Sequence, residues 1–143
     1  MSLRLADQLC FSLYAASRAM TATYGPLLAP LGLTYPQYLV MLVLWETDGV
    51  AVKSIGEALA LDSGTLTPLL KRLESQGLVR RERSTTDERV VVVFLTADGK
   101  KLKVRARAIP EKLLACTGAR ADDIAKLREE LHALSETIRS SAC

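Results

Sequence analysis

The 143-residue sequence is poor in the residues from which most catalytic and metal sites are built. It has one histidine and three cysteines, and aromatic residues make up only 5% of the chain. A single histidine, His132, argues against a zinc site of mixed thiolate and imidazole ligands. We predict that His132 is a solvated helix residue, that the chain has no metal or cofactor, and that the protein is not an enzyme.

Long hydrophobic runs and a secretory signal are also absent. Arg4 and Asp7 interrupt the start of the chain, and no apolar signal region follows them. The longest apolar run, Tyr38–Trp45, is far shorter than the roughly 20 residues that span a bilayer, so it predicts a buried helix. We therefore expect a cytoplasmic protein with no membrane partner.

The cysteines are odd in number and widely spaced, which argues against the disulfide framework of a secreted protein. Reactive thiols have to be considered instead, at Cys10, Cys116 and Cys143. The hydrophobic content of 49% supports a folded core, and the length suits a single domain over residues 1–143.

Residues 48–96 predict a winged helix-turn-helix. Val52, Ile55 and Leu59 form one stripe of a helix over 52–59, and Asp62 or Ser63 is a suitable N-cap for the next helix. That second helix buries four leucines and ends at a glycine; these residues are Leu66, Leu69, Leu70, Leu73 and Gly77.

The outer side of the second helix carries hydroxyls near its start and cations further along. In helix-turn-helix docking, such residues reach base edges and phosphates respectively. The candidate DNA contacts are Ser63, Thr65, Thr67, Pro68, Lys71 and Arg72. Pro68 removes one helical N–H, so we expect an irregular first turn. The alternative is a plain helical hairpin with a hydrated face.

Two strand-like runs follow, Leu78–Arg83 and Val90–Leu95, around a polar tip. Residues 62–107 carry 11 Lys or Arg against 6 Asp or Glu, a net charge of +5, although the whole chain is only +3. A basic hairpin beside a recognition helix indicates a wing that binds the minor groove and phosphates. The alternative is a solvated run of charge. The wing cations are Arg80, Arg81, Arg83 and Arg89.

The two ends of the chain predict helices for dimerisation, over residues 1–34 and 97–143. A helical pattern runs from Leu5 to about Leu31, with bends or an end expected at its glycine and prolines. Thr34 is a suitable cap for a helix over 35–46, and Thr96 for a basic helix bent at Pro110. A final amphipathic helix covers 122–140.

A symmetric dimer would hold two recognition helices about 34–36 Å apart, matching a pseudo-palindromic DNA operator. The expected fold is therefore mainly α with a small β-hairpin wing.

This order of elements resembles the MarR family of bacterial repressors over nearly the whole chain. Asp87-Glu88-Arg89 is similar to the family's wing motif, in which the arginine enters the minor groove and the aspartate holds the wing. Residues 9–14, 33–38 and 61–74 together resemble the organic-hydroperoxide-sensing OhrR branch.

The resemblance implies roles for the thiols and the tyrosines. Cys10 matches the branch's peroxide-reactive cysteine, Tyr24 and Tyr35 match the tyrosines that hydrogen-bond its sulfur, and Tyr14 matches a further aromatic near the site. Cys116 lies where the two-cysteine type of the branch keeps its resolving cysteine. Cys143 is an additional thiol and a competing candidate for that role.

Helix geometry constrains this site. Cys10 and Tyr24 are 14 residues apart, which is about 21 Å along a straight helix. If the two meet, Tyr24 most simply comes from the second subunit. The predicted function is a repressor released from its operator when an organic hydroperoxide oxidises Cys10 and a disulfide forms with Cys116 of the partner chain. Two alternatives stay open, a repressor released by a small aromatic ligand at the dimer cleft and a thiol peroxidase.

Overall fold

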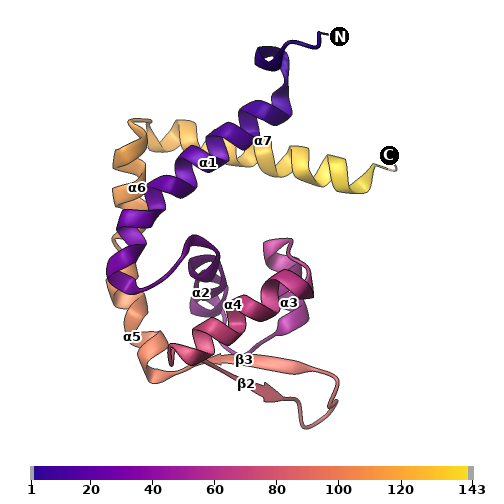
Figure 1. Cartoon of the computed structure of the whole chain (residues 1–143), viewed down its shortest axis with the longest axis vertical. Coiled ribbons are helices and arrows are strands. Elements are labelled where there is room, and N and C mark those ends of the chain that lie inside the picture. The colour runs from indigo at the N-terminus through magenta and orange to yellow at the C-terminus, as the bar shows by residue number, and fades with distance from the viewer. Residues whose placement is uncertain (1, 142–143) are drawn as a thin grey trace. The chain divides into compact units, whose positions relative to one another are not determined.

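The computed structural model describes residues 2–141, which form helices and one small antiparallel sheet (Figure 1). With η marking 3-10 helices, the elements are η1 (Leu5–Asp7), α1 (Leu9–Leu28), η2 (Ala29–Leu31), α2 (Tyr35–Glu46), β1 (Val50–Ala51), α3 (Val52–Leu59), α4 (Ser63–Ser75), β2 (Val79–Arg83), β3 (Val91–Leu95), α5 (Ala97–Ala106), α6 (Ile109–Thr117) and α7 (Ala121–Ser140). They form two units that divide between Ile109 and Pro110.

The first helix differs from the expected single pattern over 5–31. Gln8 has extended backbone, and its side-chain amide donates to the carbonyl oxygens of Ser2 and Arg4, which separates η1 from α1. The helix then continues through Gly25-Pro26, because a proline inside a helix costs a hydrogen bond but keeps a helical φ. Gly32, with φ +69°, ends η2.

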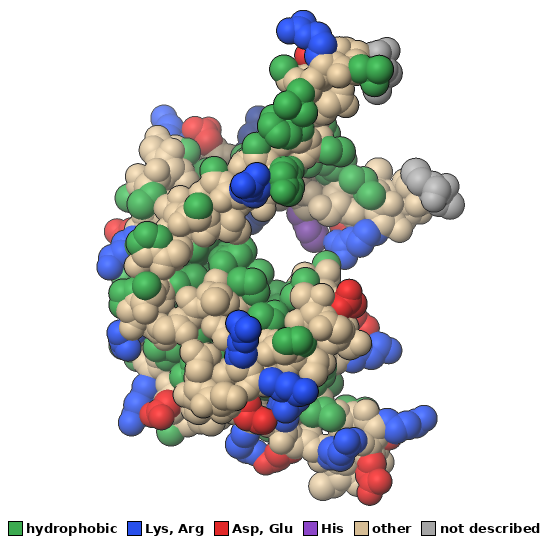
Figure 2. Space-filling model, in the orientation of Figure 1, with side chains coloured by type: hydrophobic (Ala, Val, Ile, Leu, Met, Phe, Trp, Pro, Cys, Tyr) green, Lys and Arg blue, Asp and Glu red, His purple; other side chains and the backbone are tan. Residues whose placement is uncertain are grey.

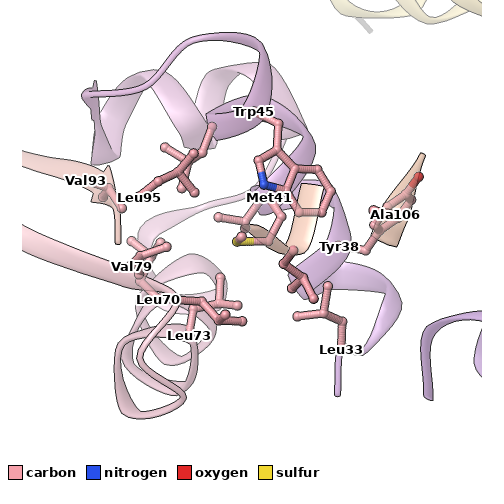
Figure 3. Close-up of a cluster of buried hydrophobic side chains, with 14 of the residues drawn as sticks. Leu33, Tyr38, Met41, Trp45, Leu70, Leu73, Val79, Val93, Leu95 and Ala106 are labelled. Carbon is pink, nitrogen blue, oxygen red and sulfur yellow. The ribbon is translucent and has the colours of Figure 1, made fainter. Parts of the chain in front are cut away.

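Helix α2 is the centre of the core. Thr34 and Gln37 form a capping box at its start, and Pro36 lies in the tolerated first turn, which confirms the predicted cap. Leu42 within the predicted buried run is 40% exposed, but the prediction is confirmed at Tyr38, Met41 and Trp45, which are all buried. Figure 3 shows these side chains among apolar residues from α4, α5 and the sheet.

The helix-turn-helix is formed by α3 and α4, as predicted. Asp62 caps α4 by accepting the Thr65 N–H at 2.7 Å, and Gly77 follows the end of the helix with φ +73°. The expectation of an irregular first turn was wrong, because α4 is helical from Ser63 through Pro68. Proline fixes φ near the helical value, so the lost hydrogen bond leaves this exposed stretch helical.

The predicted hairpin is present as β2 and β3, paired from Val79 with Leu95 to Arg83 with Val91. A third strand, β1, pairs with β3 and was missed as a strand because it is only two residues long. The Asp48 carboxylate accepts the Leu95 N–H at 2.8 Å, which joins the turn before β1 to β3. The fold is thus mainly α with a winged sheet, as predicted.

The helices after the wing also follow the prediction. Thr96 caps α5 by accepting the Gly99 N–H at 3.1 Å, and α5 and α6 are separate helices with Pro110 in the first turn of α6. Within residues 2–141, no single helix is long and apolar enough to cross a membrane, although the bent pair 9–31 and 35–46 meets that test of length and composition together.

Candidate nucleic-acid interface and reactive thiols

The face of α4 that carries the predicted DNA contacts is turned to solvent. Leu66, Leu70 and Leu73 are almost completely buried, so the opposite side of the helix is left free. Of the predicted contact residues on that side, Thr67 is half-buried. The others are exposed: Ser63, Thr65, Pro68, Lys71 and Arg72. This arrangement offers hydroxyls at the start of the helix and cations further along it.

The tip of the wing is organised by an arginine-carboxylate pair. Arg89 Nε lies 3.1 Å from Asp87 Oδ1, and the Arg89 backbone N–H also donates to this oxygen at 3.1 Å. These bonds from Arg89 hold the pKa of Asp87 below its usual value. The Arg89 side chain is nevertheless 90% exposed. The aspartate therefore orients the arginine and leaves most of its surface available to a ligand.

The other wing arginines also have partners within the chain. Arg83 donates to the Glu88 carbonyl oxygen at 2.8 Å, which closes the loop between the strands. Arg80 pairs with Glu82 and lies over the Phe94 ring at 4.6 Å. The predicted cationic rim is thus a set of cations held by local contacts.

Arg81 has a different role, which the sequence reading missed. Its guanidinium and backbone N–H both bind the Glu74 carboxylate, at 3.1 Å for the Nη2–Oε1 contact, and this lowers the pKa of Glu74. The pair joins α4 to β2 and so fixes the wing beside the recognition helix. Charge composition treats Arg81 and Arg89 alike. The register of the hairpin determines that Arg81, and not Arg89, faces Glu74.

A groove of about 630 Å³ lies between α3, the start of α4 and the wing. Apolar side chains form much of it, and the cations Lys53, Arg81 and Arg89 also line it. Figure 2 shows Lys and Arg side chains over α3, α4 and the hairpin, with a few acidic side chains among them. The groove lies between α4 and the wing, so each of these two elements presents its cations on its own side of the groove.

The two described thiols are free and exposed. Cys10 lies in the first turn of α1, and Cys116 lies near the end of α6. Cys143, the other predicted candidate for a resolving thiol, lies outside the described residues. Tyr14, one turn after Cys10, is 61% exposed, and Arg18 lies 5.4 Å from the centre of its ring. Exposure leaves Cys10 open to a solute or to another chain.

Tyr24 and Tyr35 are in contact. Their ring centroids are 4.6 Å apart, and Tyr38 lies 5.6 Å from Tyr24. Burial raises the pKa of Tyr24 to about 12, with smaller contributions from the neighbouring Tyr35 and Tyr38. Burial also raises the pKa of Tyr35. Both phenols therefore stay protonated near neutral pH, as hydrogen-bond donors require. Sequence reasoning missed Tyr38 in this cluster.

Cys10 is separated from this tyrosine cluster within one chain. Cys10 and Tyr24 both belong to the continuous helix α1, so about 21 Å of helix lies between them. One chain thus brings Tyr24 and Tyr35 together and leaves Cys10 away from both.

Both end helices have exposed apolar side chains. Leu28 is the one buried residue of α1 in the described chain, whereas Leu9, Phe11 and Met20 are 40–60% exposed. Figure 2 shows hydrophobic side chains along this helix. Helix α7 keeps the predicted apolar line, with Leu127 at 50% and Ile138 at 63% exposure. Faces of this kind are typical of helices that pair with another copy.

Comparison with known families supports a regulatory role. Residues 22–105 match the family described as transcriptional regulator SarA/Rot. The organic hydroperoxide resistance transcriptional regulator of Bacillus subtilis (strain 168) is 52% identical over 136 residues, covering 95% of this chain and 92% of that protein. The HTH-type transcriptional regulator MgrA of Staphylococcus aureus is 38% identical over 138 residues, covering 93% of this chain and 94% of that protein.

Solved structures give the same fold. AbfR of Staphylococcus epidermidis matches with a TM-score of 0.80 and 40% identity, covering 97% of this chain and 96% of that chain. Reduced AbfR bound to DNA matches with a TM-score of 0.78 and 40% identity, covering 96% of each chain. Disulfide-formed AbfR matches with a TM-score of 0.66 and 41% identity, covering 92% of this chain and 93% of that chain.

Proposed function

Because the chain belongs to the MarR family of winged-helix transcriptional regulators, in its organic-hydroperoxide-sensing OhrR branch, we propose that it is a DNA-binding repressor switched by thiol oxidation. The observation that carries the proposal is the occurrence in one chain of a solvated recognition face with an exposed thiol and two half-buried phenols. The family relation supports DNA binding, and the thiol and phenols supply the chemistry of a sensor.

In the reduced protein, α4 enters the major groove and the wing lies along the minor groove. Ser63, Thr65, Thr67 and Pro68 contact base edges, while Lys71, Arg72 and Arg83 neutralise phosphates. Arg89, held by Asp87, enters the narrow minor groove. Two copies bind a pseudo-palindromic operator on double-stranded DNA and block the promoter.

The oxidation step begins with the Cys10 thiolate. It attacks the distal oxygen of an organic hydroperoxide, the O–O bond breaks, and the leaving alkoxide takes a proton from the solvent, so that the products are the alcohol and a Cys10 sulfenic acid. The Cys116 thiol then attacks the sulfenic sulfur, forming a disulfide and releasing water. The peroxide is the oxidant, and the two thiols together supply its two electrons.

The tyrosines stabilise the reactive thiolate. An ordinary cysteine with a pKa near 8.5 is only a few per cent ionised at neutral pH, so the anion needs hydrogen-bond donors. Tyr24 and Tyr35 are protonated phenols in contact with each other. The length of α1 places them too far from Cys10 of their own chain, so we assign the pair to Cys10 of the partner in a homodimer. Tyr14 lines the same site from the Cys10 side.

In the proposed dimer, Cys116 of one chain lies against Cys10 of the other. A disulfide requires its sulfurs to be about 2.05 Å apart, so the helices that carry the two thiols must move when the bond forms. That movement changes the spacing of the two recognition helices, and the affinity for the operator falls.

The test compares operator binding by the reduced protein before and after one equivalent of an organic hydroperoxide, with the same samples run on a non-reducing gel. We expect loss of binding together with a covalent dimer that a dithiol reverses. The Cys10→Ser variant is the matched control and should bind operator normally and ignore peroxide. Release of Cys10→Ser by peroxide, or undisturbed binding by the oxidised wild type, would refute the proposed switch.

A further inference from the structure

Two side-chain amides join the end of the recognition helix to the turn before α2. Gln37 Nε2 donates to Gln76 Oε1 at 3.2 Å, and Gln76 Nε2 donates to the Gly32 carbonyl oxygen at 2.7 Å. Gln37 Oε1 accepts the Thr34 N–H at 2.9 Å. We call these two glutamines the amide link. It joins segments that are 39 and 44 positions apart in the sequence.

The inner half of the amide link is buried. Gln37 is 4% exposed, and among the described residues it is the one buried polar residue. A buried amide that loses a partner also lacks water to replace it, so such groups keep their hydrogen bonds. Gln37 therefore resists any shift that would separate it from Thr34 or from Gln76.

The outer half of the amide link belongs to α4. Gln76 is the C-cap of this helix, and its backbone N–H donates to the Arg72 carbonyl oxygen at 2.9 Å. The rest of the inner face of α4 is held by Leu66, Leu70 and Leu73. Apolar contacts are not directional and permit small sliding movements, whereas hydrogen bonds fix position and angle.

The other end of the amide link lies beside the tyrosine pair. Tyr35 is the first residue of α2, between Thr34 and Gln37, and its ring packs on Tyr24. A displacement of Tyr35 therefore displaces the two residues that hold the amide link at this end.

We propose that Gln37 and Gln76 are positioning residues that couple the tyrosine pair to the recognition helix. This inference rests on the proposed function, in which oxidation at Cys10 disturbs the tyrosine pair. The hydrogen bonds of the amide link can form only while the turn and the end of α4 keep their relative positions. When the turn moves, α4 either moves with it or loses the hydrogen bonds to the buried Gln37 side chain. The free-energy cost of losing those bonds is the coupling free energy between the tyrosine pair and the recognition helix.

The test removes the amide link without removing its bulk. Gln76→Met keeps the length of an exposed side chain and deletes both hydrogen bonds. Ser75→Ala is the matched control, because Ser75 precedes Gln76 and its hydroxyl binds only locally, to the Lys71 carbonyl oxygen at 2.9 Å. Operator dissociation constants are measured for each protein in the reduced form and after peroxide oxidation. The rate of Cys10 oxidation is measured in parallel.

The quantity that decides is the ratio of the oxidised to the reduced dissociation constant. We expect Gln76→Met to lower this ratio by roughly three- to tenfold, the range of one or two net hydrogen bonds, with the reduced affinity within about twofold of wild type. The rate of Cys10 oxidation should be unchanged. Gln37→Met should lower the ratio similarly, and the double variant should lower it no further. Ser75→Ala should keep the wild-type ratio.

A Gln76→Met ratio equal to or above that of wild type overturns the inference, including the case in which both redox states lose affinity equally. That case would show a merely structural role. A wild-type ratio of one refutes the proposed function itself, and the inference with it. The two failures are therefore distinguishable.

Discussion

At the scale of single residues, the tyrosine cluster makes its hydrogen-bond donors available over a wide pH range. Burial favours the neutral phenol over the phenolate, and this raises the pKa of Tyr24 to about 12 and the pKa values of Tyr35 and Tyr38 in the same direction. A donor that ionised near neutral pH would repel a neighbouring thiolate. These phenols keep their protons throughout the range in which a cysteine becomes ionised.

This burial predicts a loss of stability at high pH. A phenol whose pKa is raised by folding holds its proton more tightly in the native state, so its contribution is complete below the unfolded pKa of 10.0 and is lost as pH rises towards 12. The free energy of unfolding in urea should therefore fall between pH 10 and 12. Tyr24→Phe should make that fall shallower, whereas Tyr14→Phe, at an exposed position of the same helix, should not. Equal slopes for wild type and Tyr24→Phe would contradict the prediction.

At the same scale, the sequence predicts residue types better than residue contacts. The Asp62 and Thr34 caps and the Asp87–Arg89 pair follow from short-range patterns, because both partners lie within three positions. The Glu74–Arg81 pair and the Gln37–Gln76 contact depend on how α4 packs against the hairpin and against α2. No local pattern encodes that packing.

At the scale of elements, hydrophobic periodicity gives α2, α3, α7 and the hairpin within one or two residues, whereas the single helix expected over 5–31 is divided into η1, α1 and η2. The errors are local. Strand β1 has only two residues, too few to produce an alternating pattern, and it exists because β3 offers it an edge. Pro26 and Pro68 both lie inside helices, since the loss of one hydrogen bond is outweighed by the remaining turns of α1 and α4.

The wing is the element whose function is easiest to separate from its stability. Arg89 is 90% exposed and pairs with Asp87 within the loop, so Arg89→Ala should leave the free energy of unfolding nearly unchanged. Operator binding should weaken by about 1–3 kcal/mol, roughly 5- to 150-fold, because a minor-groove cation is lost. Fluorescence anisotropy with labelled operator would measure the change.

Arg107→Ala is the control for this variant, because it removes the same charge from an exposed position at the end of α5. It should weaken binding much less than Arg89→Ala. Equal effects of the two substitutions would contradict the minor-groove role of Arg89 and would show that it contributes only to the overall positive charge.

At the scale of the whole molecule, one chain does not bring Cys10 to Tyr24 and Tyr35. The sequence indicated this from helix length alone, and the continuous α1 agrees, since Cys10 and Tyr24 lie near opposite ends of it. The exposed apolar side chains of α1 and α7 point to the same need for a second copy. The pairing of Cys10 with Cys116 follows from no such argument, because sequence spacing cannot fix a contact between subunits.

Mixed dimers can decide that pairing. Cys10→Ser and Cys116→Ser chains, each also carrying Cys143→Ala and a different tag, are co-expressed and purified through both tags. Neither single variant alone can form the proposed disulfide. The mixed dimer keeps Cys10 on one chain and Cys116 on the other, so one equivalent of hydroperoxide should join the two chains covalently and dithiol should release them. If the bond instead forms within a chain, the mixed dimer stays uncrosslinked while the Cys143→Ala protein oxidises without a covalent dimer. That result would move the conformational change from the subunit interface to the interior of each chain.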